Sequence, residues 1–285
     1  LRLLQDGQLV LVYHKARRIP PEGIDPVFGR NAHLHPVMTP DGRVLTDEFP
    51  PDHAHQSGLW SAWTATRFQE RRVDFWNLFK RQGFVEHRRV LALHADPQRP
   101  GFTVEIAHVD LTSGEPIDVL IEELTVRLAG MEQGLHAFDL ETRQRLAGPD
   151  PLTIRKYTYG GVAIRLNRDW FGGSDAPNAP RYLTSTGLDR EGGDQTPMAW
   201  LFVGGDLEEQ PAGLVAMSHP DNFRHPQPVR IHNTMPYFVW SPGNKESFII
   251  GKDTPYHARY RYVVADRLPD PAEVETWYAR YRETP

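Results

Sequence analysis

Alternation of apolar and polar positions dominates the chain. Between Phe102 and His108, every second side chain is apolar or an imidazole, and Thr103 and Glu105 lie between them. The same period of two recurs at 118–128, 136–140 and 256–264. Such alternation is typical of antiparallel strands that bury one face. Turn sequences separate these runs, at 40–42, 112–114, 147–149 and 241–243.

One segment near the end of the chain has the period of a helix instead. Asp270 can cap it, Pro271 suits its first position, and Glu273 completes a capping box. The apolar positions that follow are spaced i, i+3, i+4 and i+7, at Val274, Trp277, Tyr278 and Tyr281. We therefore expect an all-β chain of about fifteen strands, too many for one flat sheet. The prediction is a single domain over 1–285, a large β-sandwich (supersandwich) with a short C-terminal helix.

Charge and composition narrow the classes of partner. The 285 residues include 32 Lys and Arg against 37 Asp and Glu, a net charge of −5, which argues against a nucleic-acid partner. No apolar run approaches the ~20 residues of a membrane span, so we expect no membrane partner. Cysteine is absent, which excludes disulfides and thiolate-bound metals. The first twelve residues lack a signal-peptide pattern, and the expected location is cytoplasmic.

Residues with useful chemistry are densest between positions 31 and 76. This segment holds two His-x-His pairs, His33 with His35 and His53 with His55. Residues two apart on a strand face the same side, so each pair would direct two imidazoles into one space. Trp60 and Trp76 follow and could pack in the core or stack on a ligand.

Two further groups lie later in the chain, and one carboxylate stands out. The first group, at 217–226, contains His219, Asn222, Arg224 and His225, and the second contains Tyr159 and Asp189. Glu122 occupies the apolar face of a predicted strand. An ionised carboxylate is costly there, so either an Arg pairs with it or it is a functional carboxylate with a raised pKa. His108 and His136 share apolar faces and are expected to be hydrogen-bonded core histidines.

Missing motifs also direct the interpretation. The chain has no GxSxG elbow, no P-loop, no GxGxxG after a strand and no HExxH. The remaining His, carboxylate, Tyr, Arg and Trp side chains suit proton transfer on a neutral polar molecule. Aromatic faces with polar edges are what a carbohydrate requires, because its ring faces stack while its hydroxyls form hydrogen bonds.

Several motifs resemble a bacterial family of unknown function known as PmoA-like. They are HLHPVMTPDG at 33–42, DHAHQSGLW at 52–60, YTYGGVAIR at 157–165, TSTGLDREGG at 184–193, SHPDNFRHP at 218–226 and RYRYVV at 259–264. The chain departs from that family at Gln56, where members often have His, and at Ala32, where they have Tyr. The resemblance implies the β-sandwich class that includes galactose mutarotase, and an association with sugar metabolism. Methane oxidation, which the family name evokes, would need membrane spans that this chain lacks.

The leading hypothesis is an enzyme that acts on a sugar or oxidised sugar, of the epimerase, mutarotase, lyase or hydrolase type. The candidate acid and base residues are His53, His55, His219, His225 and Glu122. The candidate substrate-binding residues are His33, His35, Arg43, Trp60, Trp76, Tyr159, Asp189, Asn222 and Arg224. We expect His53 or His55 to share one cleft with His219 or His225, with Trp60 or Trp76 on its wall.

Two other hypotheses remain open at this point. The first is a carbohydrate-binding module without turnover, which would use the same aromatic and polar surface. The second is a cupin-like metal enzyme with His53, His55, Glu122 and His136 as ligands. The expected partner is a small carbohydrate. No cofactor is expected, although the histidines leave room for a divalent metal. The substrate, the reaction type and the oligomeric state stay open.

Overall fold

A computed structural model describes residues 1–132 and 134–284, and its strands form three antiparallel sheets. In spatial order, the first sheet contains β1 (Arg2–Gln5), β2 (Gln8–Tyr13), β3 (His33–Val37), β4 (Leu59–Ala62), β12 (Gly161–Arg165), β18 (Tyr237–Trp240), β17 (Gln227–Ile231) and β14 (Thr196–Met198). The second contains β13 (Arg181–Thr184), β15 (Trp200–Leu207), β16 (Gln210–Ser218), β20 (Tyr256–Ala265), β10 (Leu135–Leu146), β9 (Ile117–Leu128), β8 (Gly101–Asp110) and β7 (Gly83–His94). The third is small and contains β19 (Phe248–Ile250), β11 (Leu152–Ile154), β5 (Thr66–Phe68) and β6 (Arg71–Val73).

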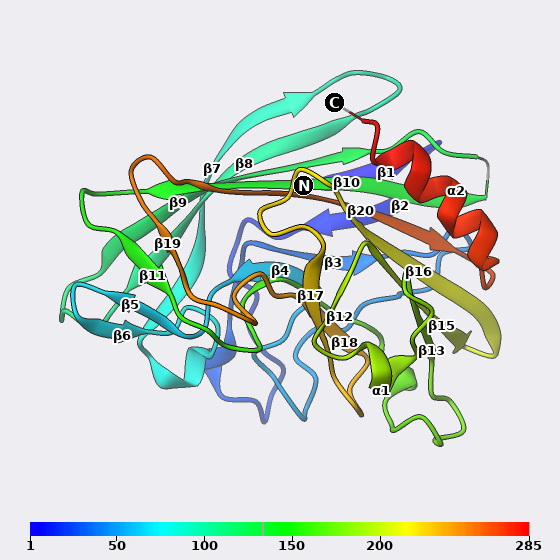
Figure 1. Cartoon of the computed structure of the whole chain (residues 1–285), viewed down its shortest axis with the longest axis horizontal. Coiled ribbons are helices and arrows are strands. Elements are labelled where there is room, and N and C mark those ends of the chain that lie inside the picture. Colours follow the sequence, from blue (N-terminus) through cyan, green and yellow to red (C-terminus); the bar gives the residue numbers. More distant parts are fainter. Residues whose placement is uncertain (133, 285) are drawn as a thin grey trace.

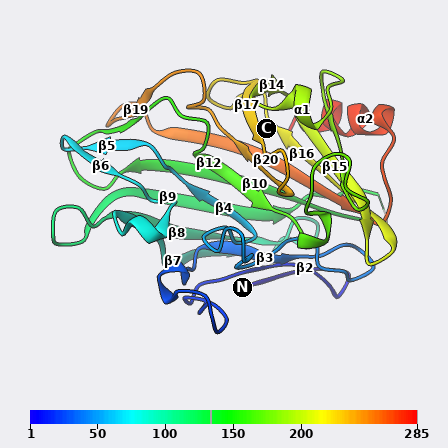
Figure 2. The ribbon, with the colours of Figure 1, turned by 90° about the horizontal axis from the view of Figure 1, so that it is seen from below.

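The first two sheets stack face to face. Figure 1 shows β12 and β17 of the first sheet below the long strands β10 and β20, and Figure 2 shows the same arrangement from below. Trp240 of the first sheet stacks on Tyr260 of the second with ring centroids 5.4 Å apart. Large aromatic side chains therefore fill the space between the sheets, as in other sandwich cores.

The register of the first sheet gives it two different faces. Leu59, Ile164, Phe238 and Ile231 lie opposite one another on four adjacent strands and point into the sandwich. The neighbouring row, on the outward face, contains Trp60, Ala163, Val239 and Arg230. The two rows point to opposite faces, because successive side chains along a strand alternate between the faces of the sheet. Loops cover the outward face, so its residues are largely buried as well.

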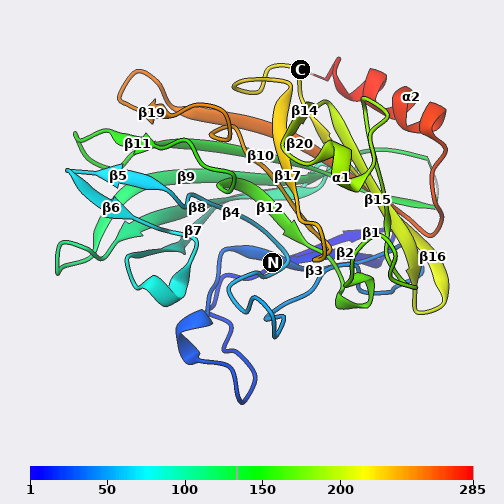
Figure 3. The same ribbon diagram turned by 60° about the horizontal axis from the view of Figure 1, so that its bottom comes forward.

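Short helices complete the fold. The 3₁₀ helices are η1 (Pro26–Phe28), η2 (Leu78–Lys80) and η3 (Arg168–Trp170), and the α-helices are α1 (Arg190–Gly193) and α2 (Pro271–Tyr281). The loop with η1, coloured blue, projects from the bottom of the molecule in Figure 3. Asp270 caps α2 by accepting a hydrogen bond from the amide of Ala272, and the helix buries Val274, Trp277 and Tyr281.

The predicted fold class is confirmed. The chain is mostly β, and its C-terminal helix begins at the predicted Pro271. The predicted alternating runs correspond to β8, β9, β10 and β20. The sequence did not predict the third sheet, whose strands span three residues each. None of the helices in the described residues is long and apolar enough to cross a bilayer.

Candidate functional site

Three histidines meet beside the outward face of the first sheet. His53 and His55 lie between β3 and β4, with ring centroids 5.5 Å apart. His232 directly follows β17, and its ring centroid is 6.5 Å from that of His53. We call His53, His55 and His232 the histidine cluster. The expectation that 53–55 forms a strand is wrong, because the segment turns, with the amide of Gln56 donating to the carbonyl of His53 at 2.8 Å.

A buried arginine and a carboxylate orient His53. Arg165, at the end of β12, is fully buried and donates to both carboxylate oxygens of Asp52 at 2.9 Å. Burial raises the pKa of Asp52, but the hydrogen bonds and charge of Arg165 outweigh burial and hold that pKa below its usual value. An ionised carboxylate can only accept, so Nδ1–H of His53 donates to Asp52 over 3.1 Å. Nε2 of His53 therefore keeps its lone pair whenever the ring is neutral.

His232 has the opposite tautomer. The backbone amides of Thr234 and Met235 donate to its Nδ1 at 3.2 and 3.1 Å. Burial, together with the charge of Arg230 nearby, lowers the pKa of His232 to about 4. The ring is therefore neutral near pH 7 and carries its proton on Nε2. His53 and His232 thus carry one acceptor nitrogen and one donor nitrogen on rings whose centroids lie 6.5 Å apart.

His55 lies between aromatic side chains from two 3₁₀ helices. Its ring centroid is 6.5 Å from that of Phe28 and 6.3 Å from that of Phe79, whose side chain is 54% exposed. Burial, followed by the charges of His53 and Arg30, lowers the pKa of His55 to about 4. Arg30 also donates to the carbonyl of His55 at 3.0 Å. His55 is therefore a second neutral imidazole in the cluster.

A polar group lies next to His232 on the same face of the sheet. Arg230 is half-buried on β17, pairs with Asp194 at 2.8 Å and lies 5.5 Å from the ring centroid of Tyr159. The guanidinium also donates to the hydroxyl of Tyr159 at 3.3 Å. Tyr159, a predicted substrate-binding residue, is therefore adjacent to the cluster through Arg230.

Trp60 and Trp76 do not form an open wall. Their ring centroids are 4.8 Å apart, and both rings also contact Tyr237. Only 2% of Trp60 and 3% of Trp76 is exposed. The expectation that either tryptophan stacks on a ligand is wrong for this structure, because the rings are covered by one another and by neighbouring loops. Arg30 connects Trp60 to the histidine cluster, because its guanidinium lies 5.4 Å from the ring centroid of Trp60 and donates to the carbonyl of His55.

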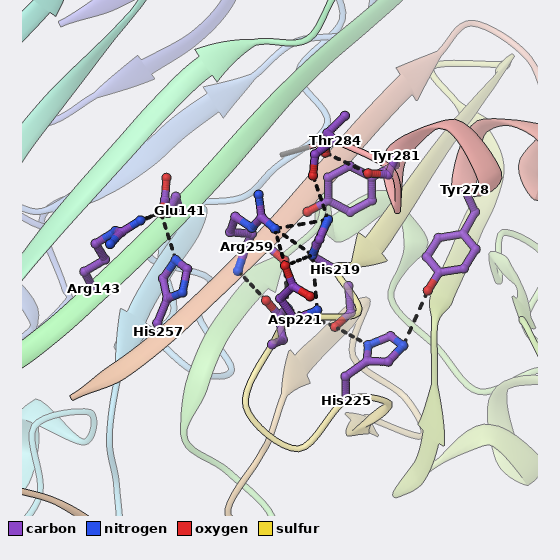
Figure 4. A network of polar contacts seen from close by, with 12 residues as sticks. Glu141, Arg143, His219, Asp221, His225, His257, Arg259, Tyr278, Tyr281 and Thr284 are labelled. Carbon is purple, nitrogen blue, oxygen red and sulfur yellow. Dashed lines mark hydrogen bonds and ion pairs between the residues drawn. The ribbon is translucent and has the colours of Figure 1, made fainter. Parts of the chain in front are cut away.

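His219 and His225 belong to a different region (Figure 4). His219 lies between Arg259 and the C-terminal helix, where Arg259 donates to its Nδ1 at 2.9 Å and its ring contacts Tyr281. His225 contacts Tyr278 of α2, with the hydroxyl 3.4 Å from Nε2. His225 precedes β17 and His232 follows it, so the two histidine groups lie at opposite ends of this strand. The predicted shared cleft is therefore not formed.

Three other predicted substrate-binding residues make hydrogen bonds within the protein. Asn222 exchanges hydrogen bonds with the backbone of Arg259, at 2.8 and 2.6 Å. Arg224 donates to the carbonyl oxygens of Pro242, Glu246 and Ser247. Asp189 caps α1 by accepting from the amide of Gly192 at 2.9 Å. The structure thus gives these side chains roles in holding loops.

Glu122 is in the core and has no exposed surface. Its oxygens accept hydrogen bonds from Nε2 of His108 at 2.7 Å and from the hydroxyl of Thr142 at 2.8 Å. Its partner is thus a histidine, where the sequence analysis expected an arginine or a functional role. Burial on this scale keeps Glu122 from any substrate, and His136 hydrogen-bonds to the carbonyl of Met38. The four ligands of the cupin-like hypothesis do not meet.

Arg43, His33 and His35 are also away from the histidine cluster. Arg43 is buried and donates to the carbonyl oxygens of Leu207 and Gln210 at 2.7 and 2.8 Å, so it is a structural residue. His33 and His35 lie on β3 as predicted, bonded to Glu48 and Thr46. Within the described ranges, one group has the proximity of metal ligands: the donor atoms of His14, His33 and Glu48 lie within 4.8 Å of one another.

Sequence reasoning missed His232, Arg165 and Arg230. Arg230 and His232 are two apart at the end of a strand, the same spacing that singled out His53 and His55. That spacing was the available signal for the pair. Arg165 ends the motif YTYGGVAIR, but nothing in the sequence shows that it lies beneath Asp52.

Comparisons with known proteins place the chain in a family. Residues 1–279 match the model of DUF6807, a family of unknown function, and the chain belongs to that family. The match does not show the PmoA-like name given by the sequence resemblance. No curated protein matches the chain in sequence.

Two solved structures have a similar arrangement of strands. The heparan sulfate lyase HepC from Pedobacter heparinus is 8% identical, with a TM-score of 0.36, over 80% of this chain and 30% of the lyase. The GalM/aldose epimerase homologue from C. elegans is 12% identical, with a TM-score of 0.34, over 85% of this chain and 94% of the homologue. The chain thus spans less than a third of the length of the lyase. Likenesses this low identify neither a substrate nor a reaction.

Proposed function

We propose that this protein is an enzyme that transfers protons on a carbohydrate at the histidine cluster. The proposal rests on the opposite tautomers of His53 and His232, whose ring centroids are 6.5 Å apart. A carboxylate-oriented imidazole is a good general base, and a neutral imidazole with a fixed N–H is a good hydrogen-bond donor. The two groups together are suited to moving a proton while an oxygen gains negative charge.

Each residue has a definite role in this mechanism. His53 accepts a proton from a sugar hydroxyl, or from a carbon next to a carbonyl, at Nε2. Asp52, held by Arg165, stabilises the imidazolium that forms. His232 donates from Nε2–H to the oxygen on which charge develops. Such steps belong to the epimerase, mutarotase and lyase types, whereas in a hydrolase the same base would take its proton from water. General acid–base catalysis contributes about 10²–10⁴-fold.

The surroundings of the cluster favour a carbohydrate as substrate. Arg230 and Tyr159 supply polar edges on one side, while Phe79 supplies an exposed ring near His55. An apolar face with polar groups beside it matches the two kinds of surface that a sugar ring presents. The net charge of −5 is consistent with a small neutral or weakly charged ligand.

The test is a screen for turnover followed by matched variants. Free sugars, oxidised sugars and short glycans are incubated with the protein and followed by proton NMR, with deuterium exchange as a second readout of proton transfer. On any confirmed substrate, His53→Gln and His232→Gln should each lower kcat/KM by about 10²-fold or more. Asp52→Asn should lower it as well, by turning His53 toward the wrong tautomer.

His257 provides a matched control. Its side chain is 36% exposed, against 42% for His53, and it also has a carboxylate partner, Glu141 at 2.8 Å. His257→Gln should leave turnover unchanged. If His53→Gln and His232→Gln retain the parent activity, the proposal is wrong. Binding of a sugar without turnover or exchange by the parent would indicate a carbohydrate-binding module instead.

A further inference from the structure

A second cluster of ligating side chains lies where β2, β3 and the following loop meet. His14 directly follows β2, His33 begins β3, and Glu48 is in the loop after β3. The backbone pairing of the two strands fixes the histidines, since the amide of His14 donates to the carbonyl of His33 at 3.0 Å. The imidazoles stack with centroids 4.8 Å apart, and Oε1 of Glu48 is 2.7 Å from Nε2 of His33.

These side chains have the charges of metal ligands. His33 is fully buried, and burial lowers its pKa to about 4, so its ring is neutral near pH 7. Burial alone would raise the pKa of Glu48, but hydrogen bonds from His33 and Arg18 outweigh it and lower that pKa to about 2. The geometry places the acceptor oxygen of Glu48 and the ring of His33 together, and an ion bound between them would take the place of the Nε2–H of His33, which now donates to Glu48.

Hydrogen bonds within the protein leave the cluster incompletely satisfied. Nε2 of His14 donates to the carbonyl of His35 at 2.6 Å, which leaves Nδ1 as its free ligand atom. Metal-binding histidines characteristically use their second nitrogen in this way, to hold a backbone carbonyl. Nδ1 of His33 is buried and has no hydrogen-bond partner. Hydrogen bonds within the protein therefore do not fully satisfy this buried ring.

The cluster also has an entrance. A cavity of about 430 Å³ is lined by Glu48, Arg18, His35, Asp47 and Arg168, among others. Arg18 is 49% exposed and pairs with Glu48 at 3.0 Å. Its guanidinium therefore pairs with the carboxylate that an ion would need. It can swing into solvent when an ion takes its place beside the buried Glu48 carboxylate.

We propose that His14, His33 and Glu48 bind one divalent transition-metal ion of the zinc class. Two imidazoles and one carboxylate form a known zinc donor set, whereas Mg²⁺ and Ca²⁺ favour oxygen ligands alone. Ligand distances of about 2.0–2.2 Å place the donor atoms roughly 3–3.5 Å apart, a small adjustment from a cluster that already lies within 4.8 Å. Glu48 is the proposed ligand that lines the cavity, so an ion would enter the site past this carboxylate.

The experiment measures binding of the metal alone to the chelator-treated full chain. Calorimetry with ZnCl₂ should give one site on the cluster, and Co²⁺ should give visible absorption bands of a nitrogen- and oxygen-ligated ion. His14→Gln and Glu48→Gln should each weaken zinc binding by about 100-fold. Loss of a residue that only supports a ligand weakens metal binding by about 10–100-fold, and loss of a ligand itself should cost at least as much. Arg18→Gln should strengthen it, because the competing guanidinium is gone. Melting temperatures in chelator verify that each variant folds.

Two controls make the result specific. His94→Gln removes a histidine that lies on β7 and contacts Thr103, and it should leave zinc affinity unchanged. His53→Gln should also leave it unchanged, because the histidine cluster of the proposed function is a separate group. Absence of zinc binding in the parent, equal affinity in His14→Gln and Glu48→Gln, or loss of the site only in His53→Gln would each overturn the proposal. These outcomes are independent of any carbohydrate activity.

Discussion

At the scale of single residues, the fold keeps several imidazoles uncharged, His55 and His232 among them, and this lowers its stability in acid. The pKa values of His55 and His232 are lowered to about 4, chiefly by burial, from a usual value of 6.5. Between those two pH values the unfolded chain binds protons that the folded chain does not. The free energy of unfolding therefore decreases as the pH falls from about 6.5 toward 4.

The lowered pKa values of His55 and His232 predict how the stability of a double variant depends on pH. In His55→Gln/His232→Gln, the loss of stability between pH 7 and about 4.5 should be smaller than in the parent, by roughly 1–3 kcal/mol after screening. Urea unfolding at both pH values measures it, and His257→Gln is the control. An equally steep loss in the double variant would show that these two rings are not the source of the pH dependence.

The Glu122 network makes a second residue-scale prediction. Removal of the carboxylate in Glu122→Ala leaves His108 and Thr142 without their buried partner, so the variant should lose about 3–5 kcal/mol of unfolding free energy. Glu122→Gln retains an oxygen that can accept and should lose less. Chemical denaturation gives both values. If the alanine variant is no less stable than the glutamine variant, the hydrogen bonds contribute little to folding.

Residue chemistry was predictable only where it followed a local pattern. His53 and His55 were found from their spacing, and Glu122 from its place on an apolar face. His219 and Asn222 showed the same polar character, but they bind Arg259 and the C-terminal segment. A list of polar residues cannot distinguish a side chain that meets a ligand from one that satisfies a loop, because the difference lies in the tertiary partner.

At the scale of elements, α2 depends on one cap and one buried face. Asp270→Ala should cost about 1 kcal/mol by removing the cap, and Trp277→Ala about 3–5 kcal/mol by emptying the space against the second sheet. Arg280→Ala is the exposed control, with a side chain that is 68% exposed, and should change stability by less than about 1 kcal/mol. Thermal and urea unfolding measure all three. Equal effects of Trp277→Ala and Arg280→Ala would contradict the packing of Trp277 against the second sheet.

Whether a strand was visible in the sequence depended on how many of its faces are buried. β9 and β10 alternate between buried and partly exposed residues, and the period of two revealed them. All residues of β4, β12 and β18 are buried, because loops cover the outward face of the first sheet. A strand buried on both sides has no alternation to detect. The strands beneath the histidine cluster were therefore the least visible ones.

At the scale of the whole molecule, Arg43 joins the two large sheets. It lies in the turn after β3 and donates to Leu207, Gln210 and Pro211 at the turn between β15 and β16. Arg43→Ala would remove the guanidinium hydrogen bonds to these carbonyl oxygens, and we expect a loss of about 2–4 kcal/mol in unfolding free energy. Arg43→Lys should restore only part of it, because one ammonium cannot reproduce the fork of the guanidinium.

Unfolding and kinetic measurements on Arg43→Ala distinguish a structural role of Arg43 from a substrate-binding role. Urea unfolding should show the loss in Arg43→Ala, while kcat/KM of the folded variant on a confirmed substrate should stay near that of the parent. Unchanged stability together with a higher KM would contradict the structural role. It would restore Arg43 to the substrate-binding residues that the sequence indicated.

The central position of β20 determines when the second sheet can be completed during synthesis. β20 lies between β10 and β16 and hydrogen-bonds to both, yet it begins about 110 residues after β10 ends. At roughly 5–20 residues per second, the ribosome leaves the open edge of β10 unpaired for about 5–20 s. An unpaired strand edge is a template for other chains. A cell that makes this protein must therefore protect two long edges until residues 256–265 emerge.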